Sequence, residues 1–191
     1  MQESFSSEGQ DVAEQPDPTV YMSRIHTPGC AWAYTSDCDD QFAKLRAKDP
    51  EAAELLAAKA RRAYTHGFPA TTNNENPQTK GYPTHRCPVG KQVQTLPDVK
   101  FNEQRPMPWA GELYVMSEDE RTMYRLYFIE QRPAWKGTTT QIVGSGIGAK
   151  PVSESVGWVS ANQTRDIHDA MDSGVTTCEN VKTRWRRWDS A

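Results

Sequence analysis

The sequence contains no hydrophobic run that approaches the roughly 18 apolar residues needed for a membrane-spanning helix. Apolar residues make up only 36% of the 191-residue chain, which indicates substantial solvated segments beside a core. The first 19 residues carry neither the basic stretch nor the apolar stretch of a signal peptide. We therefore expect a cytoplasmic protein with no membrane partner.

The four cysteines form no CxxC pair, and in a cytoplasmic chain they are most simply reduced, partly buried thiols. Zinc needs three or four converging nitrogen or sulfur ligands, which two distant segments could supply in principle. Their spacing matches no zinc-finger template, so we predict no metal site and keep structural zinc as the alternative. The candidate ligands are His26, Cys30, Cys38, His85 and Cys87.

Familiar catalytic and cofactor motifs are also missing. There is no GxSxG nucleophile motif, and no cysteine has a motif-level histidine partner. The string GSGIGAKP resembles a phosphate-binding loop, but Pro151 follows Lys150 where such a loop needs Ser or Thr opening a helix. We interpret this string as a glycine-rich strand end with close backbone approach, and we predict no cofactor, including no nucleotide cofactor.

Charge is distributed unevenly along the chain. Residues 1–18 contain five acidic residues and no Lys or Arg, which leaves 22 basic against 20 acidic residues in the remainder. We predict a disordered acidic arm over residues 1–19 and a basic aromatic tail helix over 177–191. Arginine mixed with tryptophan is suited to stacking on bases and neutralising phosphates. The alternative is that the tryptophans close over the core while the arginines are solvated. The tail residues predicted to bind RNA are Arg184, Trp185, Arg186 and Arg187.

The rest of the chain predicts a single α+β domain over residues 20–176. A short strand is expected within 20–36, followed by a helix capped by Ser36 or Asp37. A second helix should begin at the Asp49-Pro50 pair and end at Gly67, with Leu56, Ala60, Ala63 and Tyr64 as its apolar stripe. Residues 68–108 show no sustained period, so we interpret them as a long loop or an insertion.

Three further segments have the alternation and composition of strands, namely ELYVM, MYRLYFIE and TTTQIVGSGI, and SANQTRDIHDAM predicts a helix that Gly174 ends. A last helix is expected at about 177–188. The predicted fold is therefore an N-terminal helical hairpin packed on a small, mainly antiparallel meander sheet, with C-terminal helices. This meander carries Arg125 and Lys150 on one sheet, and two cations fixed on rigid backbone suit a site that grips phosphate.

This order of elements, together with the strings ELYV, YRLYF and IVGSGIGAK, resembles the RelE/HigB family of toxins over residues 30–172. These are small α/β proteins whose toxic members cut mRNA on the ribosome. The resemblance implies that Arg125 stabilises the cleaved phosphate, that Lys150 contacts RNA, and that RNA or the ribosome and an antitoxin protein are partners. The chain departs from the family pattern at Val115-Met116, lacks an arginine in 151–157, and has no tyrosine beyond Tyr127.

In RNA cleavage of this class the 2′-hydroxyl attacks the adjacent phosphate, so the protein supplies orientation, a base and cations. Among groups near the predicted strands in sequence, His168 alone has an ordinary pKa suited to acid–base work, and we predict it as the third catalytic residue, with an exposed helix position as its alternative. The predicted function is mRNA cleavage as an endoribonuclease. The alternatives are a catalytically inactive RNA- or protein-binding protein, or a viral structural or accessory protein.

Overall fold

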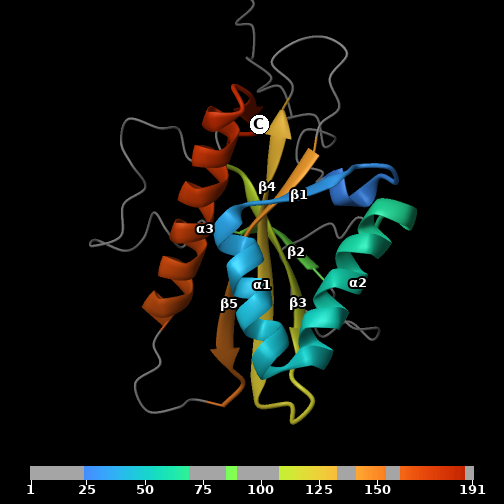
Figure 1. The fold of residues 1–191 in the computed structure, drawn as a ribbon, viewed down its shortest axis with the longest axis vertical. Coiled ribbons are helices and arrows are strands. Elements are labelled where there is room, and N and C mark those ends of the chain that lie inside the picture. The colour runs from blue at the N-terminus through green and yellow to red at the C-terminus, as the bar shows by residue number, and fades with distance from the viewer. Residues whose placement is uncertain (1–23, 69–84, 90–107, 133–140, 154–159, 188–191) are drawn as a thin grey trace, which may run out of the picture.

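The structure, a computed structural model, describes residues 24–68, 85–89, 108–132, 141–153 and 160–187. Only the backbone is described for 85–89 and for 160 and 161. The predicted acidic arm, most of the stretch 68–108 and the end of the tail lie outside these residues. Within them the chain is α+β, as predicted, with helices on both faces of one mixed sheet (Figure 1). No helix in the described part has the length and apolar character to cross a membrane.

The predicted helical hairpin is present as α1 (Ser36–Lys48) and α2 (Pro50–His66). The side chain of Thr35, rather than that of Ser36 or Asp37, accepts from the first turn of α1, which is a one-residue correction of the cap. Asp49 separates the helices and its carboxylate accepts from the Ala52 N–H at 3.0 Å, while Gly67 ends α2 at a φ of 69°. Local capping chemistry therefore sets the bounds of α2.

The sheet runs in the order β1-β5-β4-β3-β2. The three predicted strands form the antiparallel part, and β1 joins its far side in parallel with β5, which the intervening helices make possible. Strand β2 falls inside the stretch that shows no period in the sequence. The strands are β1 (Trp32–Tyr34), β2 (His85–Val89), β3 (Ala110–Met116), β4 (Thr122–Arg132), β5 (Gln141–Pro151) and β6 (Arg184–Trp185).

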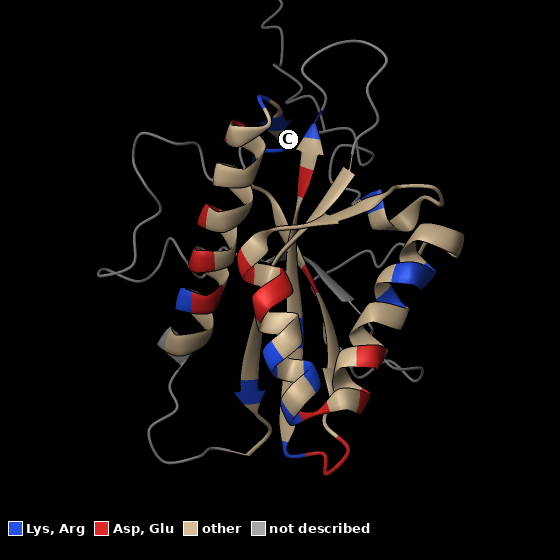
Figure 2. Ribbon diagram, in the orientation of Figure 1, with Lys and Arg blue, Asp and Glu red and all other residues tan. Residues whose placement is uncertain are grey.

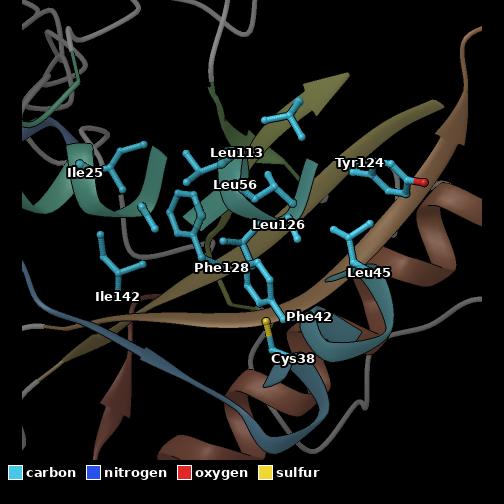
Figure 3. Packing of buried hydrophobic residues seen from close by; sticks show 14 of the residues in the cluster. Ile25, Cys38, Phe42, Leu45, Leu56, Leu113, Tyr124, Leu126, Phe128 and Ile142 are labelled. Atoms are coloured by element: carbon cyan, nitrogen blue, oxygen red, sulfur yellow. The ribbon is translucent and has the colours of Figure 1, made fainter. Parts of the chain in front are cut away.

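Alternation along β4 divides the core into two layers. Leu126 and Phe128 point toward α1 and α2, where they join a large apolar cluster (Figure 3). Tyr127 and Ile129 point to the opposite face, which α3 (Ser160–Asn180) covers. The labelled members of the first cluster are Ile25, Cys38, Phe42, Leu45, Leu56, Leu113, Tyr124, Leu126, Phe128 and Ile142.

The C-terminal part corrects two predictions. Gly174 does not end the last predicted helix, because α3 continues through it to Asn180. A Cβ there would lie 2.6 Å from the Ser145 hydroxyl, so the glycine is needed for close packing of α3 on the sheet. The helix predicted at 177–188 is absent, since its first residues belong to α3 and Arg184–Trp185 pair with the end of β4 as β6.

A side chain at one predicted apolar position of the hairpin also differs. Tyr64 was expected on the apolar stripe of α2 with Leu56, Ala60 and Ala63, but it is 51% exposed while the other three are buried. At about 100° per residue, Tyr64 lies about 40° from Ala60 on the side away from Leu56 and Ala63, which places it at the edge of the buried face.

Candidate functional site

Register places the two predicted cations on the same face of the sheet. Arg125 on β4 lies opposite Gly148 on β5, and Lys150 lies opposite Met123. Directly opposed residues of an antiparallel pair point to one side, as do residues two apart along a strand. Arg125 and Lys150 therefore both belong to the α3 face, two positions apart along β5.

The guanidinium of Arg125 is buried with incomplete hydrogen bonding. The residue is 5% exposed, and its Nε lies 3.7 Å from Oε2 of Glu112 on β3. Its Nη2 donates to the Met123 sulfur at 3.3 Å, which is a weak acceptor. Among the described residues Nε and Nη1 have no hydrogen-bond acceptor. A buried guanidinium with spare donors is an exception that calls for an explanation, and a ligand is one.

A second buried pair in the same sheet serves as an internal comparison. Arg186 is 3% exposed and donates through Nη1 to Oε2 of Glu130 at 3.4 Å, and its guanidinium carbon lies 4.2 Å from the centre of the Trp109 ring. The other carboxylate oxygen of Glu130 accepts from the Arg24 backbone N–H at 2.7 Å. These contacts anchor β6 and the segment before β1 to β4, so this pair has a structural role.

Two oxygen-bearing side chains converge next to Arg125. A Cβ at Gly148 would lie 2.7 Å from Oδ2 of Asp166 on α3 and 3.0 Å from the Tyr127 hydroxyl. Both oxygens thus approach one point on the β5 backbone, and only glycine leaves room for them there. Glu112, Arg125, Tyr127, Asp166 and Gly148 are called the Arg125 cluster below.

The members of the Arg125 cluster act on one another's protonation. Burial, assisted by the nearby Asp169 carboxylate and opposed by the charge of Arg125, raises the pKa of Asp166 to about 6. Burial and the Glu112 charge raise the pKa of the Tyr127 hydroxyl, again opposed by Arg125. A carboxylate that takes up a proton near neutrality beside a fixed cation is a common element of active sites.

Asp166 also lines a groove of about 210 Å³ between α1 and α3. The groove runs along the part of β5 that follows the residues paired with β1. The groove floor is Ser145, Gly146 and Ile147, and α1 contributes Asp37, Asp40, Gln41 and Lys44. Across it, the Ser173 hydroxyl donates to the Asp37 carboxylate at 2.9 Å. Asp166 therefore faces the buried cluster on one side and an open groove on the other.

The predicted base, His168, is not part of this cluster. It lies two residues after Asp166 on α3, a rotation of about 200° around the helix, so the two side chains leave the helix in different directions. Its ring Nδ1 is 3.6 Å from the Asp169 carboxylate, and its side chain is 24% exposed. The structure brings Arg125 and Lys150 to one face and leaves His168 turned away from Asp166.

The predicted RNA-binding tail is divided by β6. Arg186 is buried against Glu130, and Trp185 is half-buried against the core layer beneath α3. Arg184 and Arg187 are exposed. Of the three arginines in the described part of the tail, Arg184 and Arg187 therefore lie at the surface and Arg186 does not.

The described residues give no support to the alternative of a structural zinc site. Cys30 and Cys38 are buried free thiols, and His26 contacts the Phe68 carbonyl oxygen through Nδ1 at 3.0 Å. No group of three or more potential ligands gathers among the described residues. The side chains of His85 and Cys87 lie outside that set.

Sequence reasoning missed Glu112, Tyr127 and Asp166. A signal was present for two of them, because Glu112 is a lone charge in an apolar strand and Tyr127 shares the alternation of Arg125. Asp166 has no such signal, since its place depends on how α3 lies across Gly148.

No protein-family model, curated protein or solved structure matches this chain.

Proposed function

We propose that this chain is an RNA-cleaving protein of the RelE/HigB kind, acting on mRNA on the ribosome. The observation that carries the proposal is the Arg125 cluster, in which a buried guanidinium retains unused donors beside a carboxylate that titrates near neutrality. The order of elements supports it, because the helical hairpin precedes an antiparallel meander and a helix, as the resemblance implies.

In this proposal each residue has a chemical role. Arg125 neutralises the charge that develops on the phosphate as the 2′-hydroxyl attacks, and its planar donors suit two phosphate oxygens. Lys150 adds a second positive charge on the same face, at the end of β5. Because Arg125 is only 5% exposed, contact with a phosphate needs a rearrangement of the chain around it.

Induced expression tests the proposal when cell growth and RNA integrity are measured together. Arg125→Ala is a poor test variant, because it would leave Glu112 as a buried charge facing a cavity. Arg125→Lys keeps the charge and loses the paired donors, so it should relieve growth arrest and leave RNA intact. Arg132→Lys, at the exposed end of β4, is the matched control and should arrest growth like the wild type.

Wild-type protein that accumulates in folded form without slowing growth or cutting RNA would overturn the enzyme proposal. An antitoxin partner follows only if the wild type is toxic.

A specific observation favours a second candidate, a binding protein without catalysis. Helix α3 carries four acidic residues against Arg165 and His168 (Figure 2). The groove between α3 and α1 is also lined mainly by acidic residues among its charged groups. A surface of this sign suits a basic protein partner better than a polyanion. The acidic residues of α3 are Asp166, Asp169, Asp172 and Glu179.

Binding without cleavage separates the candidates. RNA binding that weakens steeply with salt and with Arg184→Ser and Arg187→Ser, on RNA that stays intact, would support a non-catalytic RNA-binding protein. No RNA binding at low salt would leave a protein partner.

A further inference from the structure

Asp166 occupies a place that no other described carboxylate shares. One of its oxygens approaches the backbone of Gly148, as the Tyr127 hydroxyl does, and Gly148 is the β5 residue paired with Arg125, whose charge acts on Asp166. The same residue lines the open groove between α1 and α3. A carboxylate that lines an accessible cavity and lies close enough to a buried cation to feel its charge can exchange a proton with a ligand in the cavity, while the cation attracts a charged part of that ligand.

We propose that Asp166, in place of His168, takes the proton from the attacking 2′-hydroxyl of RNA. This inference rests on the function proposed above. The ribose is neutral and its hydroxyl donates well to a carboxylate, so the acidic lining of the groove does not oppose its entry. The phosphate has to lie toward Arg125, on the far side of Asp166.

The chemical step balances without a cofactor. The 2′-hydroxyl transfers its proton to the Asp166 carboxylate as the O2′–P bond forms. The P–O5′ bond breaks, and the 5′ oxygen takes a proton from solvent water. The products are a 2′,3′-cyclic phosphate and a 5′-hydroxyl end, and the protonated Asp166 returns its proton to water in the groove.

The position of Tyr127 indicates a positioning role rather than a second base. Its hydroxyl approaches the same point over Gly148 as Asp166, and burial together with the Glu112 charge keeps it protonated at neutral pH. A fixed O–H donor there holds the Asp166 carboxylate or the ribose in place.

Several charges act on Asp166 and together set the pH range of its titration. Asp169 on its own helix raises the pKa, and Arg125 on β4 lowers it. Other ionisable groups lie close to it or line its groove, namely Tyr127 on β4, Glu112 on β3 through Tyr127, and Asp37, Asp40 and Lys44 on α1. Lys150 lies on the same face of the sheet, at the end of β5.

The test measures single-turnover cleavage by the purified full chain from pH 5 to 8. Its substrate is a defined mRNA on purified ribosomes, compared with the same mRNA carrying a 2′-deoxy sugar at the cut site. The wild-type rate should rise about tenfold per pH unit up to about pH 6 and then level off. The deoxy substrate should not be cut.

Two aspartates of α3 give a matched pair of variants. Asp166→Asn should lower the plateau rate roughly 10²- to 10⁴-fold and remove the rise with pH. Asp169→Asn, which also lines the groove but has a side chain that is 83% exposed, should keep a rise of the rate with pH and move that rise to lower pH. Thermal melting of each variant shows whether it is folded.

The outcomes separate this inference from the function on which it rests. Cleavage by folded Asp166→Asn with an unchanged pH profile would overturn the role of Asp166 and leave RNA cleavage standing. A wild type that cuts neither ribosome-bound nor free mRNA at any pH would overturn both.

Discussion

Replacing Asp166 by asparagine should make the protein more stable at neutral pH. The pKa of this carboxyl group rises from 3.8 to about 6 in the folded protein, chiefly because burial disfavours its charged form. A difference of about two pKa units corresponds to roughly 3 kcal/mol, and partial solvation of Asp166 reduces this to about 1–2 kcal/mol. An asparagine side chain at this position is uncharged, so the variant avoids that penalty.

The stability difference between Asp166→Asn and the wild type should depend on pH. A folded-state pKa above the unfolded value means that Asp166 favours folding most below about pH 4, and that this contribution is lost as pH rises through about 6. The gain in stability of Asp166→Asn should therefore be largest at pH 7 and close to zero at pH 4. All other titrating groups are common to both proteins and cancel in the difference.

Urea unfolding followed by tryptophan fluorescence measures the free energy of unfolding at pH 7, 5 and 4. Asp169→Asn is the control, since removing that carboxylate lowers the pKa of Asp166 and should stabilise the protein by a smaller amount at pH 7. Asp166→Asn that is less stable than the wild type at pH 7, or a difference that does not change with pH, would refute the reasoning. A variant that gains stability and loses activity is typical of a functional residue.

Three other predictions concern the framework around the site. Glu130→Gln should lower the free energy of unfolding by on the order of 3 kcal/mol, because it leaves the Arg186 charge buried without its carboxylate; a change within error in urea unfolding would show that the pair contributes little. Gly174→Ala should cost about 1–3 kcal/mol and lower the melting temperature, since its Cβ would meet the Ser145 hydroxyl at 2.6 Å, and an unchanged melting curve would mean that α3 shifts without penalty. The Cys38 thiol is fully buried with its pKa raised to about 12, so it should react with a thiol reagent only on unfolding, and rapid labelling of the native protein at Cys38 would contradict this.

Local signals in the sequence were enough for the helical hairpin. An aspartate cap, a proline in the first turn and a terminal glycine are each read from neighbouring residues, and α2 begins and ends where they predict. The same kind of reading failed at Gly174, where the close approach of Ser145 outweighs the tendency of glycine to end a helix. The prediction of a helix in the tail was wrong for a similar reason, because Arg186 is stabilised by Glu130, more than fifty residues earlier in the chain.

The candidate site likewise contains residues that the sequence predicts and one that it does not. Period-two alternation places Arg125 on the face of β4 opposite Leu126, and pairing with β5 adds Lys150. The position of Asp166 depends on the packing of α3 over Gly148 on β5. These are contacts between distant segments, and no pattern within either segment encodes them.

The two buried arginine–carboxylate pairs show why the Arg125 cluster is the better candidate for function. At Glu130 both carboxylate oxygens have donors, and Arg186 stacks on an aromatic ring, so each group gains from its partners. At Arg125 the separation from the carboxylate is longer, 3.7 Å against 3.4 Å, and two guanidinium nitrogens, against one in Arg186, make no hydrogen bond among the described residues. The adjacent Asp166 is held in an environment that disfavours its charge. An arrangement that lowers stability in this way is expected to persist where a ligand completes it, and the α3 face of the sheet is therefore where binding or catalysis should be sought first.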